Sequence, residues 1–174
     1  MATKSEAYKS LELGASGSPI ALVKLSWIWE RTILKNEKLL VSSTKSDPIT
    51  MFHGSKAPNM SVTQYVERIF KYSHCSPSCF VIAQIYMDTF LHKTGGFLTS
   101  FNAHRLLITS VMVAAKFLDD KYYSNAYYAK VGGVSTEEMN KMEIELFVTR
   151  DLFLKYCEKL DRAVELLKNG SSER

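Results

Sequence analysis

The stretch from Asn102 to Leu118 constrains the fold of this chain more than any other segment. A surface helix has one apolar stripe and a polar face opposite to it, whereas a helix that is apolar on nearly every side must be enclosed by other elements. We therefore expect residues 102–118 to form the central helix of a bundle. The apolar residues of this stretch include Leu106, Leu107, Ile108, Val111, Met112, Val113, Ala114, Ala115 and Phe117.

Shorter helices are predicted on both sides of it from helical spacing of apolar residues and from residues that start or end helices. Serines at Ser61, Ser76 and Ser135 stand where caps are expected, and Ser135 with Glu138 has the spacing of a capping box. The pairs Gly95-Gly96 and Gly132-Gly133 can adopt the left-handed turn that ends a helix. The predicted helices cover about 20–41, 61–73, 79–92, 125–131, 135–149 and 156–167, with a long surface loop at 42–60.

The whole chain is accordingly predicted to be all-α, and its 174 residues, of which 46% are hydrophobic, favour one domain. Residues 1–19 end in small and turn-forming residues, so we expect a mobile tail. A membrane-spanning protein is not expected, because no stretch approaches about 18–20 uncharged apolar residues. The first residues lack the apolar core of a secretory signal, and we expect a cytoplasmic or nuclear protein.

The net charge of +4 is mild, and basic and acidic residues are interspersed. Proteins that bind nucleic acid usually concentrate basic residues on one face, so we expect no nucleic-acid partner. The segment containing Cys75 and Cys79 suggests a metal site, but zinc usually needs two such pairs, and the third cysteine, Cys157, is distant. We expect buried cysteines, no metal and no cofactor. No catalytic signature is present, and an enzyme is not expected.

Lys116 is the one charged residue between Leu106 and Leu118. Burying an unpaired ammonium costs several kcal/mol, about 2–7 for a polar group and more for a charge, so it needs acceptors. It lies in the last helical turn, where the helix dipole favours a cation. In one interpretation it reaches Asp119, Asp120 or water. In the other it pairs with Glu143 and forms a polar pair within an apolar surface that suits a partner protein.

The stretch Ala83-Gln-Ile-Tyr-Met-Asp-Thr-Phe-Leu91 resembles the second helix of the cyclin box, and Met112-Val-Ala-Ala-Lys-Phe-Leu-Asp-Asp120 resembles the third helix of that box. The stretch Ser124-Asn-Ala-Tyr-Tyr-Ala-Lys-Val-Gly-Gly-Val-Ser135, followed by Glu138-Met-Asn-Lys-Met-Glu143, is similar to the signature of the P/U-type cyclins, which are related to the yeast phosphate-starvation cyclin. These motifs occur in the family's order and spacing over residues 58–155.

The resemblance implies a regulatory subunit that binds and activates a cyclin-dependent protein kinase. In that family a lysine of the third helix and a glutamate of the fifth anchor the kinase C-helix region, and Lys116 and Glu143 match them by sequence context. Nearby apolar residues would bury against the kinase. By position these are Phe117, Phe147, Leu152 and Leu154. The kinase, its substrates, and the choice between phosphate signalling and cell-cycle control stay open.

The resemblance also implies a single five-helix box around a central third helix, with extra helices at both ends. The expected organisation is a tail at 1–19, a helix and loop at 20–57, the cyclin box at 58–155 and a C-terminal helix and tail at 156–174. Cell-cycle cyclins carry Met-Arg-Ala-Ile-Leu in the first helix, and this chain does not, so that substrate-docking groove is not expected. Arg68 is instead expected to form a structural pair with Asp88. The rival function is a cyclin-fold adaptor that activates no kinase.

Overall fold

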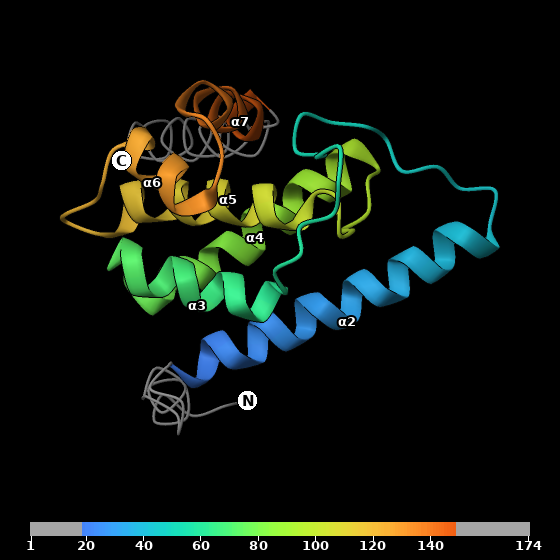
Figure 1. The fold of residues 1–174 in the computed structure, drawn as a ribbon, viewed down its shortest axis with the longest axis horizontal. Coiled ribbons are helices and arrows are strands. Elements are labelled where there is room, and N and C mark those ends of the chain that lie inside the picture. The colour runs from blue at the N-terminus through green and yellow to red at the C-terminus, as the bar shows by residue number, and fades with distance from the viewer. Residues whose placement is uncertain (1–18, 149–174) are drawn as a thin grey trace, which may run out of the picture.

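The computed structural model describes residues 19–148, and six helices carry its regular structure (Figure 1). The predicted all-α class is confirmed. Every helix expected in this range is present, and each boundary lies within two residues of the expected one. The helices are α2 (Ile20–Ser42), α3 (Val62–Ser73), α4 (Pro77–Thr94), α5 (Ala103–Leu118), α6 (Asn125–Gly132) and α7 (Thr136–Val148).

Helix α5 is the centre of the fold, as its apolar sequence predicts. It packs against α3, α4, α6 and α7, and Figure 1 shows it between α3 and α4 on one side and α6 and α7 on the other. Every residue from Leu106 to Ala115 is buried, including the hydroxyls of Thr109 and Ser110. A helix enclosed in this way fixes the positions of the helices packed against it. The residues at its two ends, where it reaches the surface, are therefore also held in place.

The helix ends follow local chemistry. Ser61 accepts a hydrogen bond from the amide of Gln64, whose side chain accepts from the amide of Ser61, and Ser135 and Glu138 form the same reciprocal pair. Gly95 and Gly133 adopt left-handed conformations, with φ of 66° and 73°, directly after α4 and α6. These short-range interactions set where α3 and α7 begin and where α4 and α6 end.

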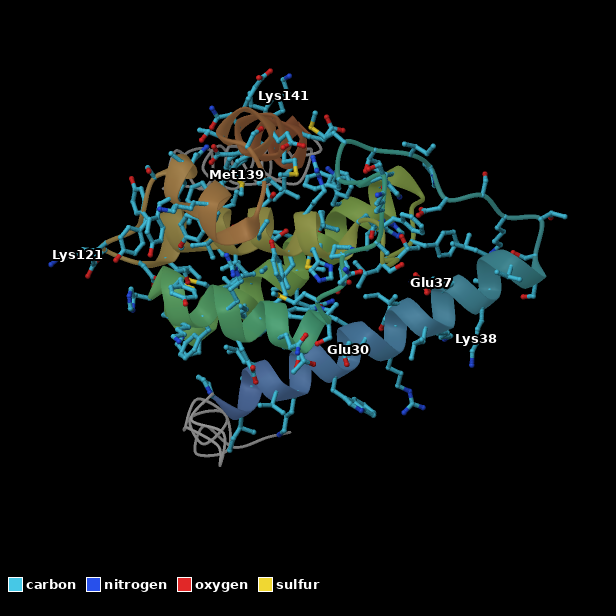
Figure 2. The ribbon with its side chains drawn as sticks, viewed as in Figure 1. Glu30, Glu37, Lys38, Lys121, Met139 and Lys141 are labelled. Atoms are coloured by element: carbon cyan, nitrogen blue, oxygen red, sulfur yellow. The ribbon has the colours of Figure 1, made fainter. Side chains whose placement is uncertain are left out.

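Helix α2 forms an additional layer under α3 and α4 (Figure 1). Its inner face buries Leu22 and Trp29, and the indole N–H of Trp29 donates a hydrogen bond to the Gln84 side chain. Two glutamates labelled in Figure 2 also tie it to the body. Glu30 accepts from the amide of Thr63 at 3.0 Å, and Glu37 accepts from the amide of Ser100 at 2.8 Å.

The segment between α2 and α3, residues 43–61, is irregular, as expected. It returns from the far end of α2 across the body and inserts the fully buried Phe52 beside Phe90 of α4, with ring centroids 4.8 Å apart. Asp47 fixes it further, because its carboxylate accepts from the amide of Phe97 and contacts His53 at 2.9 Å. The loop therefore lies over the surface but is anchored in the core, which its composition did not indicate.

The expected tail at 1–19 lies outside the described residues except for Pro19, and so do the helix expected at 156–167 and the residues Leu152, Leu154 and Cys157. Within residues 19–148, none of the helices combines the length and the apolar character needed to cross a membrane.

Candidate functional site

The last turn of α5, the first residue of α6 and the middle of α7 meet in a polar network. The ammonium Nζ of Lys116 lies 2.6 Å from Oε1 of Glu143. The predicted side-by-side position of these two residues is confirmed. Asp119, the alternative partner, instead accepts a hydrogen bond from the amide of Ser76 at 3.0 Å, next to the start of α4.

Asn125 completes the network. Its side-chain carbonyl accepts from Lys116 Nζ at 2.5 Å, and its amide nitrogen donates to Glu143 Oε2 at 2.7 Å and to Asn140 Oδ1 at 2.8 Å. One side chain thus bridges both members of the ion pair. Asn125 was not among the residues predicted for this site. The only signal was its position directly after the α6 cap, Ser124, which places it at a helix start but does not indicate its partners.

Hydrogen-bonding capacity is left over in this network. Lysine has three N–H donors, of which the two contacts above use two, and each carboxylate oxygen has two lone pairs. The Lys116 side chain is 24% exposed and that of Glu143 is 17% exposed, so both are partly shielded and still reachable. Among the described residues, the site therefore has one N–H donor and an adjacent acceptor beyond those that its own hydrogen bonds use.

Two large apolar side chains directly follow the ion-pair residues in the sequence, and both are exposed to solvent. Phe117 is 64% exposed and Ile144 is 62% exposed. Phe117 packs edge to face against the partly buried Phe147, with ring centroids 6.0 Å apart, so the structure brings together two residues that were expected to share one surface. A polar pair among exposed apolar groups is the composition of an interface centre. We call Lys116, Asn125 and Glu143, with Phe117 and Ile144, the triad surface.

A second ion pair joins α5 to α7 nearer the start of both helices. Arg105 Nη2 lies 2.9 Å from Glu138 Oε1. The backbone amide of Ser135 and the Arg105 guanidinium hold the pKa of Glu138 down at about 2. Together the two pairs connect α7 to α5 at two positions along these helices.

The predicted structural pair of Arg68 and Asp88 is wrong. The ion pairs between described residues do not include it. Arg68 Nε donates instead to the carbonyl of Val131 at 2.8 Å, because this part of α3 lies beside the end of α6. Asp88 is on the α4 side that faces α2, where it lines a small cleft of about 260 Å³ with Trp29.

Cys75 and Cys79 are buried, as expected, at the junction of α3 and α4. The Cys79 thiol contacts the Asp119 carboxylate at 3.4 Å, and a hydrogen bond with Cys75, together with burial, raises the pKa of Cys79. Between residues 19 and 148, no three histidine, cysteine or acidic side chains converge as metal ligands would. These thiols are part of the packing that holds the end of α5 in place.

Comparison with known proteins identifies the family of this chain. The sequence model of the cyclin family matches residues 18–154, which include α2 and all of the predicted box at 58–155 except its last residue. Cyclin-P3-1 of Oryza sativa subsp. japonica is 47% identical, over 93% of this chain and 75% of its own length. Cyclin-U4-1 of Arabidopsis thaliana is 50% identical over 83% and 76%, and Cyclin-U3-1 of Arabidopsis thaliana is 54% identical over 78% and 62%.

Cyclins are regulatory proteins without catalytic activity, and they generally partner cyclin-dependent kinases. The matched range covers more than half of this chain, and the relatives named above are all P- or U-type. The chain belongs to the cyclin family, and within it to the P/U-type cyclins.

Proposed function

We propose that this chain binds a cyclin-dependent protein kinase and activates it, and that the triad surface is the centre of the contact. The observation that carries the proposal is the Lys116–Asn125–Glu143 network with exposed apolar side chains beside it. Nucleic acid and membranes are not part of the proposed partnership.

The unused hydrogen-bonding groups of the network suit a helix end or a loop of the kinase. The remaining Lys116 N–H would donate to a backbone carbonyl, and Glu143 would accept from a backbone amide. Phe117 and Ile144 would be covered at the same time, which removes water from around the charged pair and strengthens its hydrogen bonds. A stable contact of this kind buries about 1,600 Å² in total, so the triad surface would form only its centre.

Activation requires preference for one kinase conformation. A protein kinase is active when a glutamate of its C-helix pairs with the lysine that holds the nucleotide phosphates. A cyclin that binds the inward position of this helix more tightly than the outward one shifts the kinase towards activity, whereas equal affinity for both would shift nothing. The rigid attachment of α5, α6 and α7 to one another supports this role, because a pre-formed surface can select one geometry.

Exchanging the charges of Lys116 and Glu143 tests whether the network binds the kinase or only stabilises the fold. The double variant Lys116→Glu/Glu143→Lys keeps one ammonium and one carboxylate together, and the Asn125 amide can turn over to serve both. We expect its melting temperature to stay close to that of the unmodified protein. The kinase would meet reversed charges, and we expect its binding to weaken by at least about 30-fold, the effect of about 2–5 kcal/mol for a disrupted buried charge pair.

The measurement is affinity capture of the tagged full chain from cells of its own organism, with mass spectrometry to quantify cyclin-dependent kinase and a histone H1 phosphorylation assay on the captured complex. The matched control is Glu137→Lys/Lys141→Glu, which swaps an exposed ion pair one turn away on α7. Full kinase recovery by the Lys116/Glu143 swap would show that the triad surface is not the contact. Kinase recovered with the unmodified chain but not stimulated would favour the adaptor function.

A further inference from the structure

The outer face of α2, opposite to the face that packs on α3 and α4, carries a line of exposed apolar side chains. Trp27, Leu34 and Val41 follow one another at intervals of seven residues, and Val23 lies one turn before Trp27. Their exposed fractions range from 47% at Val23 to 89% at Val41. Residues at this spacing form a nearly straight line along a helix, here about 27 Å long. We call these four residues the α2 stripe.

The exposed charged residues of α2 are all basic, and they lie along one side of the stripe. Lys24, Arg31 and Lys38 also repeat every seven residues, and Lys35 lies beside them. None of the four pairs with a carboxylate of residues 19–148. The Arg31 guanidinium lies 5.1 Å from the centre of the Trp27 ring, a cation–π contact that orients the ring on the helix surface.

The two acidic residues of α2 lie along the other side of the stripe and are already in use. Glu30 and Glu37 are partly buried, and their carboxylates accept the hydrogen bonds from α3 and from the start of α5 described above. Figure 2 shows Glu37 on the side of α2 towards the body of the molecule and Lys38 pointing away from it. The outer face thus combines an apolar line with uncompensated positive charge at one edge.

This charge arrangement favours one class of partner over two others. An amphipathic helix that lies on an anionic membrane presents no carboxylates beside its apolar side chains, whereas Glu30 and Glu37 border the α2 stripe. A second copy of α2 would offer no free carboxylates to the four basic residues. A helix of another protein, with apolar residues at heptad spacing and acidic residues on the matching flank, satisfies both the stripe and the charges.

We propose that the α2 stripe binds an acidic amphipathic helix of a partner protein. The apolar side chains of that helix would cover Trp27 and Leu34, and its carboxylates would pair with Lys24, Arg31 and Lys38. Helix α2 packs on α3 and α4, whereas the triad surface belongs to α5, α6 and α7 (Figure 1). The proposal therefore does not rest on kinase activation, and either can fail without the other.

The test selects binders of the purified full chain from a display library of peptides as long as α2, 23 residues, that covers the proteome of its own organism. We expect the selected peptides to share apolar residues at heptad spacing with glutamate or aspartate beside them. Selection of peptides without this pattern, or of none, would overturn the proposal. The best peptide is then synthesised in three forms: unmodified, with its acidic residues changed to glutamine, and with them changed to lysine.

Affinities measured by fluorescence polarisation separate the apolar contribution from the charges. We expect Trp27→Ala/Leu34→Ala and Arg31→Glu/Lys38→Glu each to weaken binding of the unmodified peptide at least about tenfold. The matched control, Lys121→Glu/Lys130→Glu, reverses two exposed lysines outside α2 and should leave the affinity unchanged. The lysine form of the peptide should bind Arg31→Glu/Lys38→Glu more tightly than it binds the unmodified chain, a rescue that a loss of folding cannot produce.

Unchanged affinity in both α2 variants, or equal binding of the acidic and glutamine peptides, would contradict the proposal. So would a dimer of the unmodified chain that Trp27→Ala/Leu34→Ala dissociates, or sedimentation with phosphatidylserine vesicles that this variant abolishes. Kinase capture by Arg31→Glu/Lys38→Glu should match that of the unmodified protein. Loss of the kinase from this variant, at an unchanged melting temperature, would assign the stripe to the kinase contact instead.

Discussion

The two ion pairs that join α5 to α7 differ in how far solvent reaches their carboxylates. The Glu143 side chain is 17% exposed, and that of Glu138 is 45% exposed. Exposed pairs contribute little to stability, whereas shielded charged pairs are costly to break. Asn125 adds to this contrast, because it contacts only the shielded pair. The residues nearest the proposed kinase contact are therefore also those whose geometry is most restricted.

Acid should weaken the fold through Glu138. Its pKa in the folded protein is about 2 against an ordinary value of 4.5, so its stabilising effect is present above pH 4.5 and is lost as the pH falls towards 2. We expect the urea midpoint to fall between pH 6 and pH 3 by more in the unmodified protein than in Glu138→Gln. Burial lowers the pKa of His104, but both proteins carry this group and its effect cancels.

The control for this experiment is Glu67→Gln on the exposed face of α3, which removes a carboxylate without removing an ion pair of the described chain. Its pH dependence should follow that of the unmodified protein. An identical loss of stability in Glu138→Gln and the unmodified protein would mean that this carboxylate is not stabilised in the folded state.

At the scale of elements, the helix ends decide which side chains reach the functional surfaces. Gly133 ends α6 in the left-handed region and turns the chain towards α7, which places Glu143 opposite Lys116. Within residues 19–148, no atom lies within 4 Å of where its Cβ would stand, so these residues leave space at this position. The backbone conformation alone makes glycine suitable here.

Gly133→Ala should therefore destabilise the protein by about 1–2 kcal/mol, the cost of a left-handed conformation for an ordinary residue. Gly133→Asn should cost less, because asparagine tolerates this conformation better. Chemical unfolding of the two variants measures the difference. Equal stability of the alanine variant and the unmodified protein would show that the turn can be rebuilt without a positive φ.

At the scale of the whole molecule, α2 is a structural layer of the fold. It buries Trp29 to 2% exposure against α4, while Trp27, two residues earlier, is 58% exposed on the opposite side. The cyclin family match also begins before α2. The domain is thus larger than the five helices of the box, and its stability depends on contacts across this layer.

The two tryptophans provide a matched pair of variants. Trp29→Ala should cost about 3–5 kcal/mol, because it removes a large buried side chain and leaves a cavity. Trp27→Ala should change stability by less than about 1 kcal/mol, since it loses only an exposed side chain and a contact with Arg31. Unfolding followed by circular dichroism measures both. Similar losses would contradict the placement of α2.

Helix positions could be predicted from the sequence because caps, glycines and apolar spacing act within a few residues. The pairing of Lys116 with Glu143 was one of two open alternatives on chemical grounds and was favoured by family resemblance. Asn125 and Arg68 show where prediction fails. Glu143 lies 18 residues from Asn125, and Val131 lies 63 residues from Arg68. The sequence near each residue does not indicate which helices will lie close together after packing.

The all-α class and the one enclosed helix follow from the amino-acid sequence alone, because an apolar helix surface leaves no alternative to burial. The helix ends and, through its motifs, membership of the cyclin family also follow from the sequence. Which side chains share a surface depends instead on the packed fold, as the third member of the triad and the partner of Arg68 show. These depend on how three or four helices approach one another, and that geometry is set by side-chain packing over the whole core.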